Sequence, residues 1–189
     1  MKQTALLGAT AIAIAIGFAS APYAVPAQTP QPYASLQARP VKALSKQQIA
    51  DLKEGRGMGL ALAAELNGYP GPTHVLELAE SLQLSEAQRA QVQVLLEAMK
   101  AETVPLGEKL IAQETDLDRQ FADRTITETS LAAATQAIGA TQAALRAAHL
   151  KYHLATIKVL SPTQVHRYAE LRGYAGGSQS QHQHGSHPR

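Results

Sequence analysis

The pattern L-S-x-x-Q occurs three times in this chain of 189 residues, at positions 44–48, 84–88 and 160–164. In each copy the serine hydroxyl can accept a hydrogen bond from the backbone N–H three residues later, while the glutamine side chain accepts one from the serine N–H. This reciprocal pair is a capping box, which marks the N-terminus of a helix. The copies therefore predict helices that begin near residues 45, 85 and 161. The motif residues of the last two copies are Leu84, Ser85, Gln88, Leu160, Ser161 and Gln164.

Composition agrees with a helical chain and excludes several classes of site. The chain has no cysteine, so it has no disulfide framework, thiolate metal site or cysteine nucleophile. Its formal net charge of +2 gives no argument for nucleic-acid binding. No set of serine, histidine and aspartate stands out from the helix caps, so we expect a protein that is not an enzyme.

The two ends of the chain are predicted to lie outside the folded domain. Residues 1–27 resemble a signal peptide, because Lys2 precedes an apolar run at 6–18 and small residues allow cleavage after Ala21 or Ala27. The alternative is a membrane anchor, but the run is shorter than the ~20 residues that span a bilayer. Residues 28–43 are rich in proline and glutamine and are predicted to be a flexible leader, and residues 173–189 a disordered tail. This leaves 44–172 as the helical domain.

A long helical hairpin is predicted over residues 85–159, with its turn at 122–127. Thr125 and Glu128 are candidates for a further capping box, and Pro105 with Gly107 should kink the first arm. The apolar face of the first arm is predicted to comprise Val92, Leu95, Leu96, Met99, Leu106, Leu110, Leu117 and Phe121. The second arm has an apolar residue every seven positions, as in a coiled coil: Leu131, Ile138, Leu145, Tyr152 and Val159.

Charge also favours pairing of the two arms. Residues 77–128 contain 11 acidic and 5 basic side chains, whereas 129–169 contain 4 basic and no acidic ones. Each exposed ion pair contributes only ~0.2–1 kcal/mol, and the alternative is that each arm has its own solvated face. A two-helix hairpin buries too little apolar area alone, so short flanking helices or a second chain must cover it. We therefore predict an all-α protein, a long antiparallel helical hairpin with short flanking helices, that forms a homodimer.

The arrangement of the second and third motif copies resembles the LTxxQ-motif family of exported helical proteins, the Spy and CpxP group and their zinc-resistance and heavy-metal-sensor relatives. The resemblance covers about 74–172 and departs from the family in having serine for threonine in both motifs. It implies a cradle-like dimer in the Gram-negative periplasm. Family members act as ATP-independent chaperones that hold unfolded or misfolded clients, as modulators of membrane sensor kinases, or as metal binders.

Two groups of histidines are candidate metal ligands, although no metal or other cofactor is expected to be required. His149 and His153 are spaced i, i+4 on the second arm, so both imidazoles could face one zinc or other divalent transition metal ion. A third ligand could come from His74, His166 or a carboxylate of the acidic arm. The alternative interpretation is two polar residues flanking the apolar seam. The tail histidines could capture metal weakly or form an inert solubilising tail: His182, His184 and His187.

Two glycine-rich stretches lie in the segment before the hairpin. Residues 55–59, GRGMG, lack the lysine and strand of a phosphate loop and are predicted to end the first helix, with Met58 and Leu60 packing nearby. Residues 68–72, GYPGP, are predicted to form a rigid turn before a helix around His74.

Three functions follow as expectations. The first is a periplasmic, non-enzymatic stress protein that binds exposed apolar segments of clients. The second is a periplasmic metal-binding or sensing protein that uses His149 and His153. The third is a regulator that docks on a membrane sensor.

Overall fold

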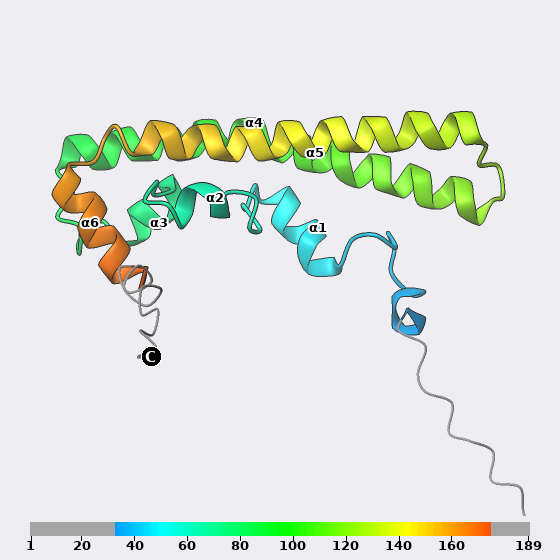
Figure 1. Ribbon diagram of the computed structural model, residues 1–189, viewed down its shortest axis with the longest axis horizontal. Helices are drawn as coiled ribbons and strands as arrows, with labels where there is room; N and C mark the ends of the chain where they lie inside the picture. The colour runs from blue at the N-terminus through cyan, green and yellow to red at the C-terminus, as the bar shows by residue number, and fades with distance from the viewer. Residues whose placement is uncertain (1–32, 175–189) are drawn as a thin grey trace, which may run out of the picture. The chain divides into compact units, whose positions relative to one another are not determined.

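The computed structural model describes residues 33–174, and these residues form helices joined by short loops, without a β-strand in that range (Figure 1). The predicted signal peptide at 1–27 and the tail histidines His182, His184 and His187 lie outside the described residues. None of the helices within 33–174 is long and apolar enough to span a membrane. The elements in chain order are η1 (Ala34–Leu36), α1 (Lys46–Lys53), α2 (Leu62–Glu65), α3 (Pro72–Glu77), α4 (Glu86–Ala122), α5 (Glu128–Thr156) and α6 (Pro162–Leu171).

The three predicted helix starts are confirmed. Ser45, Ser85 and Ser161 each cap a helix, and each forms the full capping box with the glutamine three residues later. The hairpin turn also falls where it was predicted, between the end of α4 and the start of α5. Its capping box, however, is made by Thr127 and Ser130, so the pairing of Thr125 with Glu128 was wrong.

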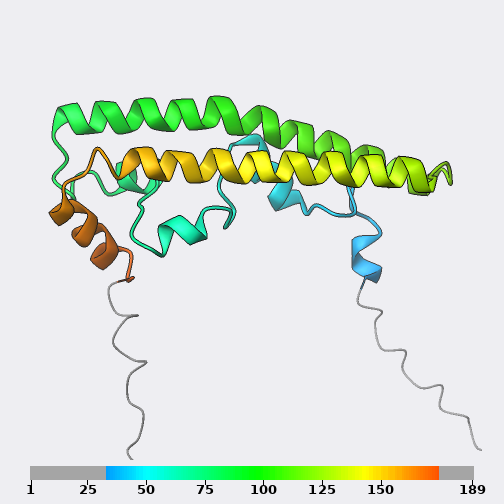
Figure 2. The ribbon, with the colours of Figure 1, turned by 45° about the horizontal axis from the view of Figure 1, so that its top comes forward.

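Helices α4 and α5 pack against each other as the predicted hairpin, and the heptad seam is confirmed over its middle. Ile138, Leu145 and Tyr152 of α5 are buried. At the hairpin tip the seam prediction was wrong, since Phe121 and Leu131 are 54% and 37% exposed. The short helices α1, α2 and α3 lie along one side of this hairpin in both Figure 1 and Figure 2.

Pro105 lies inside α4, which continues through it without a break. Figure 2 shows the axis of α4 changing direction about midway along the helix. Two residues later, Gly107 allows α1 to approach closely, because a Cβ atom at this position would lie 2.5 Å from the carbonyl oxygen of Leu52. Gly107 is therefore the point where the end of α1 rests on α4.

The core consists of two apolar clusters. The first lies at the open end of the hairpin and contains Val75, Ala79, Leu82, Leu84, Val92, Leu160 and Tyr168. The second lies under α1 and contains Val41, Leu44, Leu52, Leu110, Ile138 and Leu145. Packing thus reaches slightly beyond the predicted 44–172 at both ends, because Val41 is buried in the second cluster and Tyr174 packs against the first.

The second and third motif copies meet in space. The Gln88 amide donates to the side-chain oxygen of Gln164 over 2.9 Å, and the Gln164 amide donates back over 3.1 Å. Both amides also reach backbone carbonyls, that of Val159 from Gln88 and that of Leu82 from Gln164. Each glutamine therefore closes its own capping box and also ties α4 to α6.

Candidate functional site

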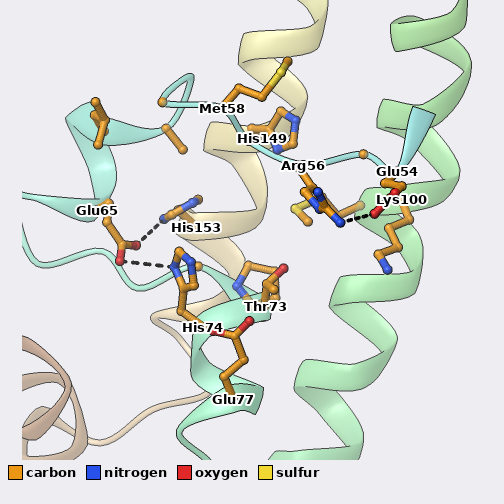
Figure 3. A pocket seen from close by; sticks show the side chains of 18 residues that line it. Glu54, Arg56, Met58, Glu65, Thr73, His74, Glu77, Lys100, His149 and His153 are labelled. Carbon is orange, nitrogen blue, oxygen red and sulfur yellow. Dashed lines mark hydrogen bonds and ion pairs between the residues drawn. The ribbon is translucent and has the colours of Figure 1, made fainter. Parts of the chain in front are cut away.

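The two histidines predicted to be metal ligands, His149 and His153, are buried on the side of α5 that faces α2 and α3. Only 2% of His149 and 7% of His153 is exposed. They border a cavity of about 390 Å³ between the hairpin and the segment that precedes it (Figure 3). Its remaining walls come from the 54–59 loop, α2, the start of α3 and the middle of α4.

The two glycine-rich stretches, 55–59 and 68–72, contribute residues to the cavity lining. The local structure predicted for them is partly confirmed. Helix α1 ends at Lys53 and Gly55 follows with a φ of 68°, so the stretch does break the first helix. Leu60 packs against the second apolar cluster as predicted, but Met58 is 40% exposed, so its predicted packing was wrong. Residues 68–71 lead into α3, which begins at Pro72 and contains His74, as expected.

His153 is held in one orientation from two sides. Its Nδ1 lies 2.6 Å from the backbone carbonyl oxygen of Tyr69, so this nitrogen carries the proton and donates it. Gly71 packs flat against the ring, since a Cβ atom there would lie 2.8 Å from Nε2. In the uncharged form of the ring, this leaves the lone pair on Nε2.

His149 is less well satisfied. Its Nε2 is buried and has no hydrogen-bond partner within residues 33–174, and Gly57 lies beside the ring. Burial, and then the proximity of His153, lower the pKa of His149 below its ordinary value. His149 is therefore neutral at pH 7.

The neutral state of His149 makes folding sensitive to acid. Because its folded pKa lies below its unfolded value of 6.5, the unfolded chain binds more protons, so its contribution to stability is lost as the pH falls below about 6.5. We expect the free energy of unfolding to fall between pH 7 and pH 5 in the wild type, and to fall less in His149→Leu. Urea unfolding across this range measures both slopes, and parallel slopes would contradict a buried neutral His149.

Glu65, at the end of α2, lines the same cavity and was missed by the sequence analysis. Only 6% of the residue is exposed, and its carboxylate lies near five groups from other parts of the chain. They are the hydroxyl of Tyr168, the hydroxyl of Tyr174 at 3.3 Å, His74 Nδ1 at 3.4 Å, Arg172 Nε at 3.6 Å and His153 Nδ1 at 3.8 Å. The only signal in the sequence is a single acidic residue within the apolar stretch 60–66.

The electrostatics of Glu65 favour the ionised carboxylate. Burial alone would raise the pKa of Glu65, but hydrogen bonds from His74 and Tyr168 and the nearby charges of His74 and His153 lower it to about 2. Burial and the same hydrogen bond raise the pKa of Tyr168, which keeps its hydroxyl protonated as a donor. Glu65 is thus an anionic acceptor at neutral pH.

The residues predicted to supply a third metal ligand, His74 and His166, lie in different places. His74 lies beside Glu65 and His153, whereas the His166 side chain is 74% exposed on α6 and faces Glu170. Figure 3 shows Glu65, His74 and His153 pointing toward one another, with His149 apart from them. As they stand, no three histidine or carboxylate side chains within 33–174 are grouped closely enough to hold a metal ion.

A second, apolar site lies on the opposite side of the hairpin. Here α4, α5 and the residues just after α5 border an open groove of about 450 Å³, called the α4–α5 groove below. It is lined by Ala90, Gln91, Val94, Leu95, Ala155 and Val159. Two residues along a helix correspond to a rotation of about 200°, which is why Ala155 faces away from the cavity that His153 borders. Val94 is 64% exposed, so the groove presents apolar side chains without a charged residue in its lining.

Comparison with known proteins does not identify the chain. No family model matches it, and neither does any curated protein or solved structure. The resemblance to the LTxxQ-motif family therefore stays a prediction.

Proposed function

We propose that this protein is a non-enzymatic, ATP-independent binder of unfolded polypeptides in the periplasm, and that the α4–α5 groove holds their apolar segments. The observation that carries the proposal is the groove itself, which is open, uncharged and bordered by the exposed Val94. Exposed apolar surface that is not used for folding is typical of an interaction site.

The shape of the groove favours an unfolded polypeptide over a small molecule. A shallow surface between two helices can accept apolar side chains from an extended segment that continues past its ends, whereas ligand pockets enclose most of their ligand. An uncharged lining also makes no demand on the charge of the client. The groove therefore suits clients that differ in sequence but share exposed apolar residues.

A charge placed in the groove tests this function. We expect Val94→Asp to weaken the suppression of aggregation of an unfolded model client by roughly tenfold or more, because burying an apolar side chain contributes ~1.5–3 kcal/mol and a carboxylate resists desolvation. Light scattering at increasing ratios of protein to client measures this.

The matched control is Leu66→Asp, which alters a leucine that is 57% exposed next to α2, on the cavity side of the hairpin. It should suppress aggregation as well as the wild type does. Equal suppression by Val94→Asp and Leu66→Asp would remove the groove from the proposal, and wild-type protein that fails to suppress aggregation would remove the function.

The second candidate function is the binding of zinc, nickel or copper by His149 and His153. It is favoured by the state of His153, because an imidazole that donates from Nδ1 to a backbone carbonyl and leaves Nε2 free is the usual arrangement of a metal ligand. His149, one turn earlier, supplies a neutral imidazole. Two protein ligands alone predict weak binding, with solvent completing the coordination.

Calorimetry can separate this site from the tail. In a chain whose tail histidines are replaced by glutamine, we expect weak binding of Zn²⁺ that disappears in the His149→Ala, His153→Ala pair. The control is His166→Ala, which should leave the titration unchanged because His166 is exposed on α6. Binding that survives the loss of both buried histidines would contradict the site.

A further inference from the structure

Helix α6 is attached to the rest of the domain by few groups. Its one buried residue is Tyr168, of which 2% is exposed. Two groups of polar contacts hold the helix in place. One is the hydrogen bond from the Tyr168 hydroxyl to Glu65. The other centres on Gln164, whose amide pairs with that of Gln88 and also donates to the backbone carbonyl of Leu82.

Glu65 contacts groups from several elements. His74 of α3 and His153 of α5 face its carboxylate from the hairpin side. Tyr168, Arg172 and Tyr174 face it from α6 and the residues that follow. The carboxylate thus joins α6 and the residues after it to α2, α3 and α5.

The surface beneath α6 is the first apolar cluster. Tyr168 packs there with Val75, Leu82, Val92 and Leu160. Val159 packs against this cluster and also lines the α4–α5 groove. Val159 therefore connects the groove to the apolar cluster against which α6 packs.

We propose that α6 is a detachable cover, held shut by the contact between Tyr168 and Glu65, and that its release lengthens the client-binding groove. This inference rests on the proposed function, since it describes how that same surface is regulated. With α6 closed, the groove accepts a short apolar segment. With α6 open, the buried apolar side chains of the cluster become available to a longer segment of the unfolded polypeptide.

Hydrogen exchange of the full chain tests the cover, with Tyr168→Phe as the variant. The phenyl ring retains the packing but loses the hydrogen bond to a charged acceptor, which contributes ~1.5–3 kcal/mol, so amide exchange in α6 should rise roughly ten- to hundredfold. Amides in the middle of α4 and α5 should keep their wild-type rates. Tyr69→Phe is the matched control, because the Tyr69 hydroxyl is not among the groups on Glu65, and should change neither helix. If Tyr168→Phe does not fold, Glu65→Gln removes the charge while keeping the side-chain size.

Client binding by the same variants separates this inference from the function it rests on. We expect Tyr168→Phe to bind an unfolded client severalfold more tightly than the wild type or Tyr69→Phe. Unchanged exchange in α6, or exchange that rises equally in α4 and α5, would overturn the cover. Faster exchange in α6 without tighter client binding would overturn the regulation while the proposed function stands. If wild type and Val94→Asp bound the client equally, the groove would be removed from the proposal, and a wild type that bound no client would remove the proposed function itself.

Discussion

Leu145→Ala should destabilise the protein by ~2–5 kcal/mol, the usual cost of removing a large side chain from a packed core. Leu145 is 2% exposed and lies at the centre of the α4–α5 seam within the second apolar cluster. Truncation there leaves a cavity between two long helices that cannot close around it without changing their spacing. Urea unfolding followed by circular dichroism measures the free energy of unfolding.

Leu131 is the matched control for this substitution, since it occupies the same heptad position two repeats earlier and is 37% exposed. We expect Leu131→Ala to change the free energy of unfolding by less than about 0.5 kcal/mol. Similar losses at both positions would mean that the seam packs along its whole length, as in a regular coiled coil, and would contradict the exposed tip.

The second large effect concerns two helical glycines, for which replacement by alanine should change stability in opposite directions. A Cβ atom at Gly107 would meet the backbone of Leu52, which cannot rotate away, so Gly107→Ala should cost ~1–3 kcal/mol as α1 is pushed from α4. A Cβ atom at Gly139 meets nothing within 4 Å, so Gly139→Ala should stabilise α5 by ~0.5–1 kcal/mol.

Thermal unfolding of the two glycine variants gives the comparison directly. The melting temperature should fall for Gly107→Ala and rise for Gly139→Ala relative to the wild type. A rise at both positions would show that α1 does not rest on Gly107. A fall at both would show that Gly139 is packed against something outside the described residues.

The parts of the fold that depend on local chemistry could be predicted from the sequence. A capping box involves residues three apart, so the starts at Ser45, Ser85 and Ser161 follow from the sequence alone. The heptads of α5 likewise define which face is apolar. They do not show where the partner helix stops covering that face, and this is why Leu131 and Phe121 were wrongly assigned to the packed seam.

The parts of the site that depend on distant contacts could not be predicted. The partners of Glu65 extend to Tyr174, 109 positions away, and no periodicity connects them. The glutamines of two motif copies were identified as capping residues, but their contact with each other requires the hairpin to bring Gln88 and Gln164 together. Spacing did suggest that His149 and His153 share a surface, and both line one cavity. It could not show that Tyr69 would hold one of them or that the candidate third ligands would lie apart.

The most direct test of the proposed function is to observe the groove while a client binds. Because the chain contains no cysteine, Val94→Cys supplies a single thiol for an environment-sensitive fluorescent dye, and Leu66→Cys supplies the control on the cavity side of the hairpin. On addition of an unfolded client, we expect a saturable blue shift from the dye at position 94 and no shift from the dye at position 66. No shift at position 94, or equal shifts at the two positions, would contradict binding in the α4–α5 groove.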